Sequence, residues 1–254
     1  MFLLSPAFCG GRRASILLNT RSQAVTALEF RSGRMSLGRA FAFMSGLYFR
    51  GKLAYAERFG EVLVITPTRG LQPPTLPFNL ELLREFAVGD VSLDNPAYRR
   101  ALSKDATALA RRIGDAQVVL LGSVASGKYV DVLLPIFGDR LRFPIDFVGR
   151  GDMSRGGLLL RSAASGVELS YEPLTAGVRP RGPRPPKLDP LTRVRPGVAV
   201  SLGHEANGSS TGRLHGIVEP ALGAAGAPGA KGLDAVVDIR LRPRARVHRR
   251  TRSE

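Results

Sequence analysis

The chain has 254 residues, of which 44% are hydrophobic, and it carries 37 Lys and Arg against 21 Asp and Glu, for a net charge of +16. No apolar run approaches the length of a membrane span, the single cysteine excludes an intrachain disulfide, and all three histidines lie beyond residue 200. We therefore expect a cytoplasmic protein with no membrane partner and no imidazole chemistry in its first 178 residues, and the positive charge favours nucleotides or nucleic acid as partners.

The first third of the chain predicts two strands with helices between them. Residues 2–4 predict a strand that leads into a glycine-rich loop, and residues 12–30 predict a helix. Ser36 is a candidate N-cap for a long segment with helical periodicity, which Ser45 and Gly46 would kink or split. A β-branched run at residues 61–66 predicts a buried strand of a parallel sheet.

The next segments repeat this alternation. A short helix is predicted over residues 78–86, and Asn95 followed by Pro96 predicts the start of a helix that ends at Ile113. The most regular strand, at residues 117–121, is followed by a Gly/Ser-rich loop and a helix that ends at Gly138. Strands at 141–147 and 167–171 enclose a helix at 154–164.

This order predicts an α/β domain over residues 1–178, with a three-layer Rossmann-like fold and a mostly parallel sheet covered by helices on both faces. Residues 179–254 carry 15 Lys and Arg against 6 Asp and Glu, and they are rich in proline and glycine. They predict a largely disordered basic tail.

Four polar, glycine-containing loops follow the predicted strands. Right-handed crossovers bring such loops to the edge where parallel strands end, which is where ligands bind in open α/β sheets. We call this edge the carboxyl edge, and we predict that its cations neutralise phosphate while its glycine loops supply N–H donors. The predicted ligand-binding residues are Gly10, Gly11, Arg12, Thr66, Thr68, Arg69, Gly122, Ser123, Ser126, Gly127, Lys128, Tyr129, Arg150, Ser154 and Arg155.

The loop from Gly122 to Tyr129 matches the phosphate-binding pattern G-x-x-x-x-G-K between a strand and a helix. A P-loop has Ser or Thr after the lysine to hold Mg²⁺, and this chain has Tyr129 there. Three interpretations remain: a degenerate P-loop that needs Mg²⁺, a general anion site, or a tight turn whose glycines serve packing. The sequence leaves any other cofactor open, and no protein metal site is predicted.

Three residues are candidates for catalysis. Cys9 lies beside Arg12 at a predicted helix N-terminus, a setting that lowers the pKa of a thiol, although a lone cysteine is also a common small core residue. Asp131 and Asp152 are candidate acid–base groups. A charged helix face for Asp131 and an N-cap for Asp152 are the structural alternatives.

Several segments together resemble a known family. They are Leu47 to Glu57, Val62 to Thr66 with Gly70-Leu71, and Val119 to Gly122 followed by Tyr129 and Leu133-Leu134. Over roughly residues 1–165 the chain resembles a family of uncharacterised bacterial α/β domains, which is distantly similar to the peroxide-stress protein YaaA and to domains found alongside deazaguanine modification of nucleic acids.

This resemblance implies a Rossmann-like or glycosylase-like three-layer fold and a link to nucleotides or nucleic acids. The family tends to have Ser-Cys followed closely by Lys after the first strand, whereas here Ser5 and Cys9 are separated and Arg12 is the nearest cation. The family also tends to have Ser-Ala-Lys after the second strand, where this chain has Thr66 to Arg69. A particular catalytic lysine therefore does not carry over.

The sequence thus predicts a protein that binds a nucleotide or a nucleic-acid-derived ligand at the carboxyl edge. If it is an enzyme, a glycosidic-bond transferase or hydrolase is favoured, with Asp152 or Asp131 as acid–base group. The alternatives are a non-catalytic nucleic-acid-binding accessory protein and a degenerate P-loop protein.

Overall fold

The computed structural model describes residues 1–175, 180, 182–186 and 188. The predicted disordered tail lies outside the described residues except for these last few positions. Within the described part, no helix is long and apolar enough to cross a membrane.

A six-stranded mixed sheet forms the centre of the fold, in the order β3-β2-β1-β4-β5-β6. The four inner strands are parallel, and each edge strand is antiparallel to its neighbour. The strands are β1 (Phe2–Leu4), β2 (Val62–Ile65), β3 (Leu71–Gln72), β4 (Val118–Leu121), β5 (Leu141–Pro144) and β6 (Tyr171–Pro173). The predicted α/β class is confirmed, but the sequence missed β3, which is two residues long.

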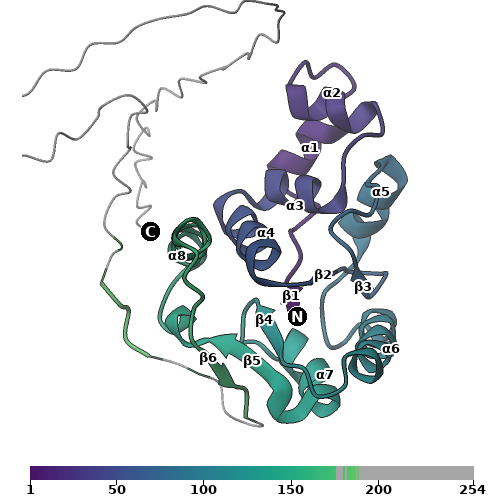
Figure 1. Cartoon of the computed structure of the whole chain (residues 1–254). Helices are drawn as coiled ribbons and strands as arrows, with labels where there is room; N and C mark the ends of the chain where they lie inside the picture. The colour runs from purple at the N-terminus through teal and green to yellow at the C-terminus, as the bar shows by residue number, and fades with distance from the viewer. Residues whose placement is uncertain (176–179, 181, 187, 189–254) are drawn as a thin grey trace, which may run out of the picture. The chain divides into compact units, whose positions relative to one another are not determined.

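Eight α-helices surround the sheet in the described part of the chain (Figure 1). They are α1 (Arg12–Leu18), α2 (Val25–Arg31), α3 (Leu37–Ser45), α4 (Leu47–Phe59), α5 (Leu80–Val88), α6 (Pro96–Ile113), α7 (Gly127–Phe137) and α8 (Asp152–Ser165). Two 3-10 turns, η1 (Gly138–Arg140) and η2 (Ile145–Phe147), flank β5.

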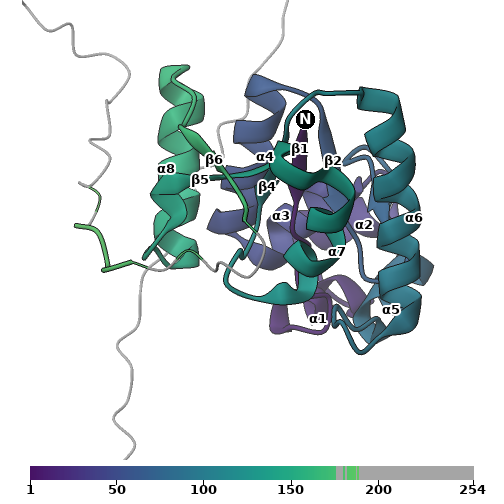
Figure 2. The same ribbon diagram turned by 90° about the horizontal axis from the view of Figure 1, so that it is seen from below.

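Helices cover both faces of the sheet because alternate strand residues point to opposite sides. Phe2 and Leu4 of β1 belong to a core shared with α4 and α8, whereas Leu3 between them belongs to a second core shared with α6 and α7. Figure 2 shows α6 and α8 on opposite sides of the strands. The predicted three layers are therefore present.

One predicted helix is wrong. Residues 12–30 form α1 and α2 with a break between them, where the Asn19 side chain accepts a hydrogen bond from the Arg21 amide at 3.0 Å. Such a local side-chain bond competes with helix continuation. Two apolar residues of this segment, Ile16 and Leu28, are exposed.

The split of the following helix is confirmed. Ser36 caps α3 by accepting a hydrogen bond from the Arg39 amide. Gly46 lies between α3 and α4 with a φ of 69°, which favours glycine. This break sets the first turn of α4 at the carboxyl edge, because α4 then runs back to the start of β2.

The chain order reverses between β1 and β4, which are adjacent and parallel. The chain leaves β1 toward β2 on one side and later returns to form β4 on the other. The carboxyl ends of β1 and β4 therefore form a topological switch point, the usual ligand position in open α/β sheets.

Two glycines bring α4 and α8 together beside this point. A Cβ atom on Gly51 would lie 2.5 Å from the Gly156 carbonyl oxygen, and one on Gly156 would lie 2.7 Å from the Leu47 carbonyl oxygen. Only glycine permits this approach of two helix backbones. The first turns of both helices are thereby placed side by side.

Candidate functional site

A buried lysine lies at the end of β1. Lys52 of α4 is 1% exposed, and its Nζ donates hydrogen bonds to the Ser5 carbonyl oxygen at 2.6 Å and to Ser5 Oγ at 2.8 Å. The same Nζ lies 4.6 Å from the ring centre of Tyr48 and 4.8 Å from that of Phe49. Ser5 itself is buried.

Burial changes the protonation of this amine. Removal from water disfavours the charged form and lowers the pKa of Lys52 to about 7, and the negative charge of Asp152 opposes this decrease only in part. The neutral and charged forms of Lys52 are therefore both populated near neutral pH. A neutral amine has a lone pair that can accept a proton.

Tyr129 approaches Ser5 from α7. Burial raises the pKa of Tyr129, and a side-chain hydrogen bond with Ser5 offsets part of this increase. Tyr129 therefore stays protonated at neutral pH.

A Cβ atom on Gly122, just after β4, would lie 3.0 Å from the Cβ of Ser5, so the close approach of the two strand ends requires a small residue there. We call Ser5, Lys52 and Tyr129 the Ser5 cluster.

Asp152 is a carboxylate whose charge acts on Lys52 and Tyr129 of this cluster. Its side chain is 71% exposed at the start of α8, and an Arg155 nitrogen lies 3.8 Å from its carboxylate. Its charge acts to raise the pKa values of Lys52, Tyr48 and Tyr129. Of the two predicted acid–base carboxylates, Asp152 is therefore the one associated with the Ser5 cluster.

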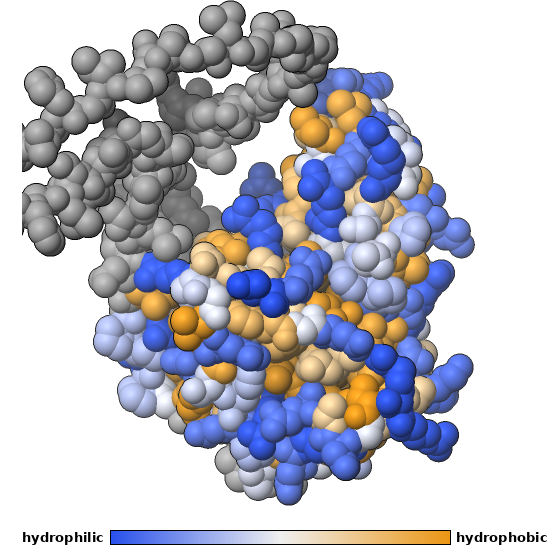
Figure 3. Space-filling view, in the orientation of Figure 1, coloured by the Kyte–Doolittle hydropathy of each residue, from blue (hydrophilic) through white to orange (hydrophobic). Residues whose placement is uncertain are grey.

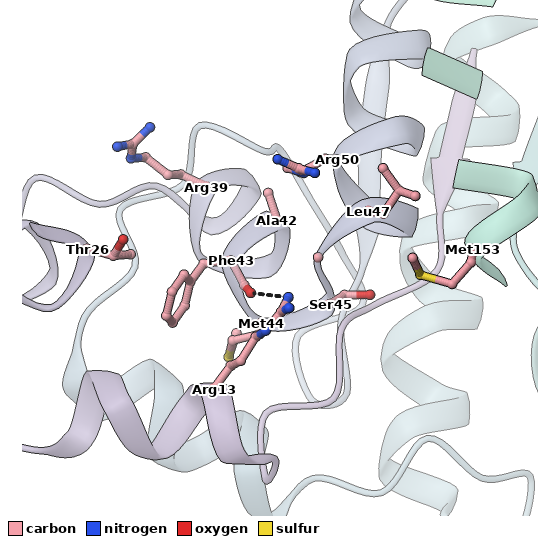
Figure 4. A pocket seen from close by; sticks show the side chains of 11 residues that line it. Arg13, Thr26, Arg39, Ala42, Phe43, Met44, Ser45, Leu47, Arg50 and Met153 are labelled. Carbon is pink, nitrogen blue, oxygen red and sulfur yellow. Dashed lines mark hydrogen bonds between the residues drawn. The ribbon is translucent and has the colours of Figure 1, made fainter. Parts of the chain in front are cut away.

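An open cavity of about 800 Å³ lies at the first turn of α4 (Figure 4). Arg13 of α1, Arg39 of α3 and Arg50 of α4 lie around it, so three helices contribute cations. We call it the arginine cavity. Its other lining residues are Thr26, Ala42, Phe43, Met44, Ser45, Gly46, Leu47 and Met153.

Two of these arginines have protein contacts that orient them. Arg13 donates to the Phe43 carbonyl oxygen at 3.1 Å, the dashed line in Figure 4. Arg39 forms an ion pair with Glu29 at 2.5 Å. A guanidinium has five N–H donors, so one such contact leaves donors for a ligand.

The arginine cavity and the Ser5 cluster adjoin along the chain. Leu47 and Met153 line the cavity. The residue after Leu47 is Tyr48, whose ring lies against Lys52 Nζ, and the residue before Met153 is Asp152, whose charge acts on Lys52. The cavity thus lies at the predicted carboxyl edge, but its cations are not the predicted ones.

The predicted residues of the loop after β2 stabilise that loop. Arg69 forms two hydrogen bonds of 3.0 Å and one of 2.5 Å to the Glu85 carboxylate, which also accepts from Thr68. Thr66 donates to the Gly70 carbonyl oxygen at 3.0 Å and accepts from the Arg69 amide. The prediction that Arg69 binds phosphate is not supported, because the Glu85 carboxylate is hydrogen-bonded to two nitrogens of the Arg69 guanidinium.

Arg150 and Arg155 hold the segment before α8. Arg150 donates to the Asp146 carbonyl oxygen at 3.0 Å and to Ser154 Oγ at 3.3 Å. Arg155 donates to the Phe147 carbonyl oxygen at 3.0 and 3.2 Å. Both guanidinium groups and the Ser154 hydroxyl therefore serve the local fold.

The P-loop-like segment does not resemble a phosphate cradle. Val124, in the middle of the loop between Ser123 and Ser126, is buried in the core. A Cβ atom on Gly127 would lie 2.0 Å from an Asp131 carboxylate oxygen, so a negative charge lies against the first turn of α7. Lys128 lies over the Tyr129 ring at 5.2 Å.

The surroundings of Cys9 do not support the predicted reactive thiol. Its Sγ is buried and donates to the Ala7 carbonyl oxygen at 3.7 Å, and burial raises the pKa of the thiol to about 12. Burial alone accounts for this increase in the pKa, and Arg12 is exposed to water. Gly10 and Gly11 lie beside the ring of Phe8.

Asp131 lies in a different place from Asp152. It lines a second open groove, of about 550 Å³, with Arg99, Arg100 and Lys104 of α6. The two predicted acid–base carboxylates are therefore not brought together. Within the described residues, no group of three or more His, Cys, Asp or Glu is arranged to hold a metal ion.

Sequence reasoning missed Lys52 and Ser5. One signal was available: helical spacing places Lys52 on the same apolar face as Tyr48 and Tyr55, where a charged residue is unusual. The arginines of the cavity gave no comparable signal, because three separate helices bring them together.

Comparisons with known proteins do not assign the chain to a family. We found no family model, no curated protein and no solved structure that matches the chain. The family resemblance described above therefore stays a prediction.

Proposed function

We propose that the protein binds a phosphate-bearing ligand of nucleotide size in the arginine cavity. The observation that carries this proposal is the placement of Arg13, Arg39 and Arg50, from three different helices, around one cavity at the carboxyl edge. Guanidinium forks suit the geometry and charge of phosphate. A volume of about 800 Å³ falls within the range of small-molecule sites.

The remaining lining suits the rest of a nucleotide. Phe43, Met44, Leu47 and Met153 supply apolar surface against which a base or sugar can pack. The cavity also includes Gly46 and Leu47 at the start of the 13-residue helix α4. The positive end of the helix dipole adds to the attraction of the arginines for an anion.

A reaction on a glycosidic bond would use Asp152 as its acid–base group. Asp152 adjoins the cavity residue Met153 in the chain, and its side chain is largely exposed. Asp131 cannot serve as the second carboxylate of the same site because it lines the groove beside α6. The classical two-carboxylate arrangement is therefore not part of this proposal.

The basic surface of α6 favours a second candidate function, which is binding of the nucleic-acid backbone. Arg99, Arg100 and Lys104 line the open groove beside α7. Figure 3 shows strongly hydrophilic side chains gathered over α6. An open cationic groove suits phosphates along a strand better than it suits one enclosed ligand.

Calorimetric titration of the full chain with AMP, ADP and ATP tests the first proposal. Loss of a hydrogen bond to a charged group costs about 1.5 to 3 kcal/mol, so Arg50→Ala should weaken nucleotide affinity by about tenfold or more. Arg84→Ala, an exposed arginine on α5, is the matched control and should leave affinity unchanged. Equal affinities for all three proteins, or no heat of binding, would overturn the proposal.

The second candidate has a different signature. Binding of a single-stranded oligonucleotide should weaken steeply with salt and on substitution of Arg99 and Arg100 by alanine. Arg50→Ala should then have the smaller effect. The reverse order of effects would assign oligonucleotide binding to the arginine cavity.

A further inference from the structure

The Ser5 cluster has an arrangement that packing alone does not explain. Lys52 Nζ lies 2.8 Å from Ser5 Oγ, and both residues are at least nine-tenths buried. Among the described residues, no carboxylate lies within ion-pair distance of Lys52. Burial of a lysine without an ionic partner is costly, and an apolar side chain would fill the same space at lower cost.

The surroundings of Ser5 suit proton transfer. Lys52 of α4 and Tyr129 of α7 both reach Ser5, which directly follows β1. Ser5 also lies at the switch point, where the ends of β1 and β4 approach so closely that Gly122 cannot carry a Cβ atom without contact. A hydroxyl, an amine and a phenol therefore converge from the loop after β1, from α4 and from α7.

We propose that Ser5 and Lys52 form a serine–lysine catalytic pair that transfers the acyl group of a small ester or amide. The neutral Lys52 amine takes the proton of the Ser5 hydroxyl while Ser5 Oγ attacks the carbonyl carbon, so that an Oγ–C bond forms and the carbonyl oxygen becomes an oxyanion. The Tyr129 side chain, which shares a hydrogen bond with Ser5, holds the Ser5 side chain in position and transfers no proton.

The following steps release both products and regenerate the free Ser5 hydroxyl and the neutral Lys52 amine. Collapse of the tetrahedral species breaks the bond from carbon to the leaving oxygen or nitrogen, which takes its proton from the Lys52 ammonium. Water then attacks the acyl-serine, gives one proton to Lys52, and releases the acid while Ser5 Oγ recovers that proton. No metal, reductant or further reactant is needed.

This inference does not rest on nucleotide binding, because its residues do not line the arginine cavity. The two sites adjoin along the chain at Leu47 and Met153. Burial lowers the pKa of Lys52, and the charge of Asp152 on α8 opposes this. The other groups that face its Nζ are the rings of Tyr48 and Phe49 on α4 and the side chain of Ser5, which in turn shares a hydrogen bond with Tyr129 of α7.

Labelling of the full chain by diisopropyl fluorophosphate, followed by intact-mass and peptide analysis, tests the proposal. We expect one adduct, on Ser5, whose formation rate rises with pH around a midpoint near 7, the pKa to which burial lowers Lys52. General-base assistance contributes about 100-fold or more, so Lys52→Met should slow labelling by about that factor. Ser5→Ala should abolish the adduct.

Ser162→Ala is the matched control, because Ser162 on α8 has the same exposure of 6% as Ser5 but its hydroxyl donates to the Val167 carbonyl oxygen. This variant should label like the natural chain. If Lys52→Met does not fold, the pH profile of the natural chain decides the matter. No adduct on Ser5, or a labelling rate that shows no rise around pH 7, would overturn the proposal.

Discussion

The Nζ of Lys52 lies 2.6 Å from the carbonyl oxygen of Ser5, although 47 residues separate the two in the chain. This contact joins the first strand of the sheet to a helix that covers it. It also places an amine of lowered pKa at the switch point between β1 and β4.

The first prediction concerns stability against pH. The folded-state pKa of Lys52 is about 7 against an ordinary 10.5, so between these values the unfolded chain binds the proton more readily than the folded chain does. Stability from this group therefore rises with pH above 7 and is lost as pH falls toward 7. Between pH 7 and 8.5 we expect the change to be about 1 to 2 kcal/mol.

Chemical denaturation of the natural chain and of Lys52→Met at several pH values measures this effect. The difference in unfolding free energy between the two should shift in favour of the natural chain as pH rises. Lys104→Met, which changes an exposed lysine on α6, is the control and should run parallel to the natural chain. A difference that does not change with pH would contradict a lowered pKa for Lys52.

A second prediction concerns the contact of α4 with α8. Gly51→Ala should destabilise the fold by about 1 to 3 kcal/mol, because its new Cβ would lie 2.5 Å from the Gly156 carbonyl oxygen and backbone would have to move. Gly157→Ala is a matched control on α8, where the nearest atom to a Cβ would be a Leu188 side-chain carbon at 3.6 Å. That change should be neutral or stabilising. Equal melting temperatures for the two variants would contradict close backbone packing.

A third prediction concerns Cys9. Its thiol is buried and its pKa is raised to about 12, so a disulfide reagent at pH 8 should react slowly with the folded chain. The reaction should accelerate to the rate of an ordinary thiol in denaturant. Rapid reaction of the folded chain would show that the thiol is exposed and activated.

The sequence predicted the class of fold because its signals were local. Ser36, Asn95 and Pro96 mark helix starts, and the apolar runs at β2 and β4 mark buried strands. The break after α1 was missed because a single Asn19 side-chain bond decides it. The two-residue strand β3 is too short to show any periodicity.

The sequence predicted a ligand site at the carboxyl edge, and the arginine cavity lies at this edge with cations other than the predicted ones. The carboxyl edge follows from the alternation of strands and helices, whereas the partner of each cation depends on tertiary contacts. Arg69 is bound by Glu85, and Arg150 and Arg155 by backbone carbonyls, which the sequence alone does not reveal. Lys52 was passed over because a lysine within a helix is usually exposed.

A crystal structure of the full chain with AMP tests the central claim most directly. We predict density for the nucleotide in the arginine cavity, with its phosphate within hydrogen-bonding distance of Arg50 or Arg13 and its base against Phe43 or Met153. A nucleotide bound instead at the first turn of α7 beside Lys128, or in the groove beside Arg99 and Arg100, would contradict the claim.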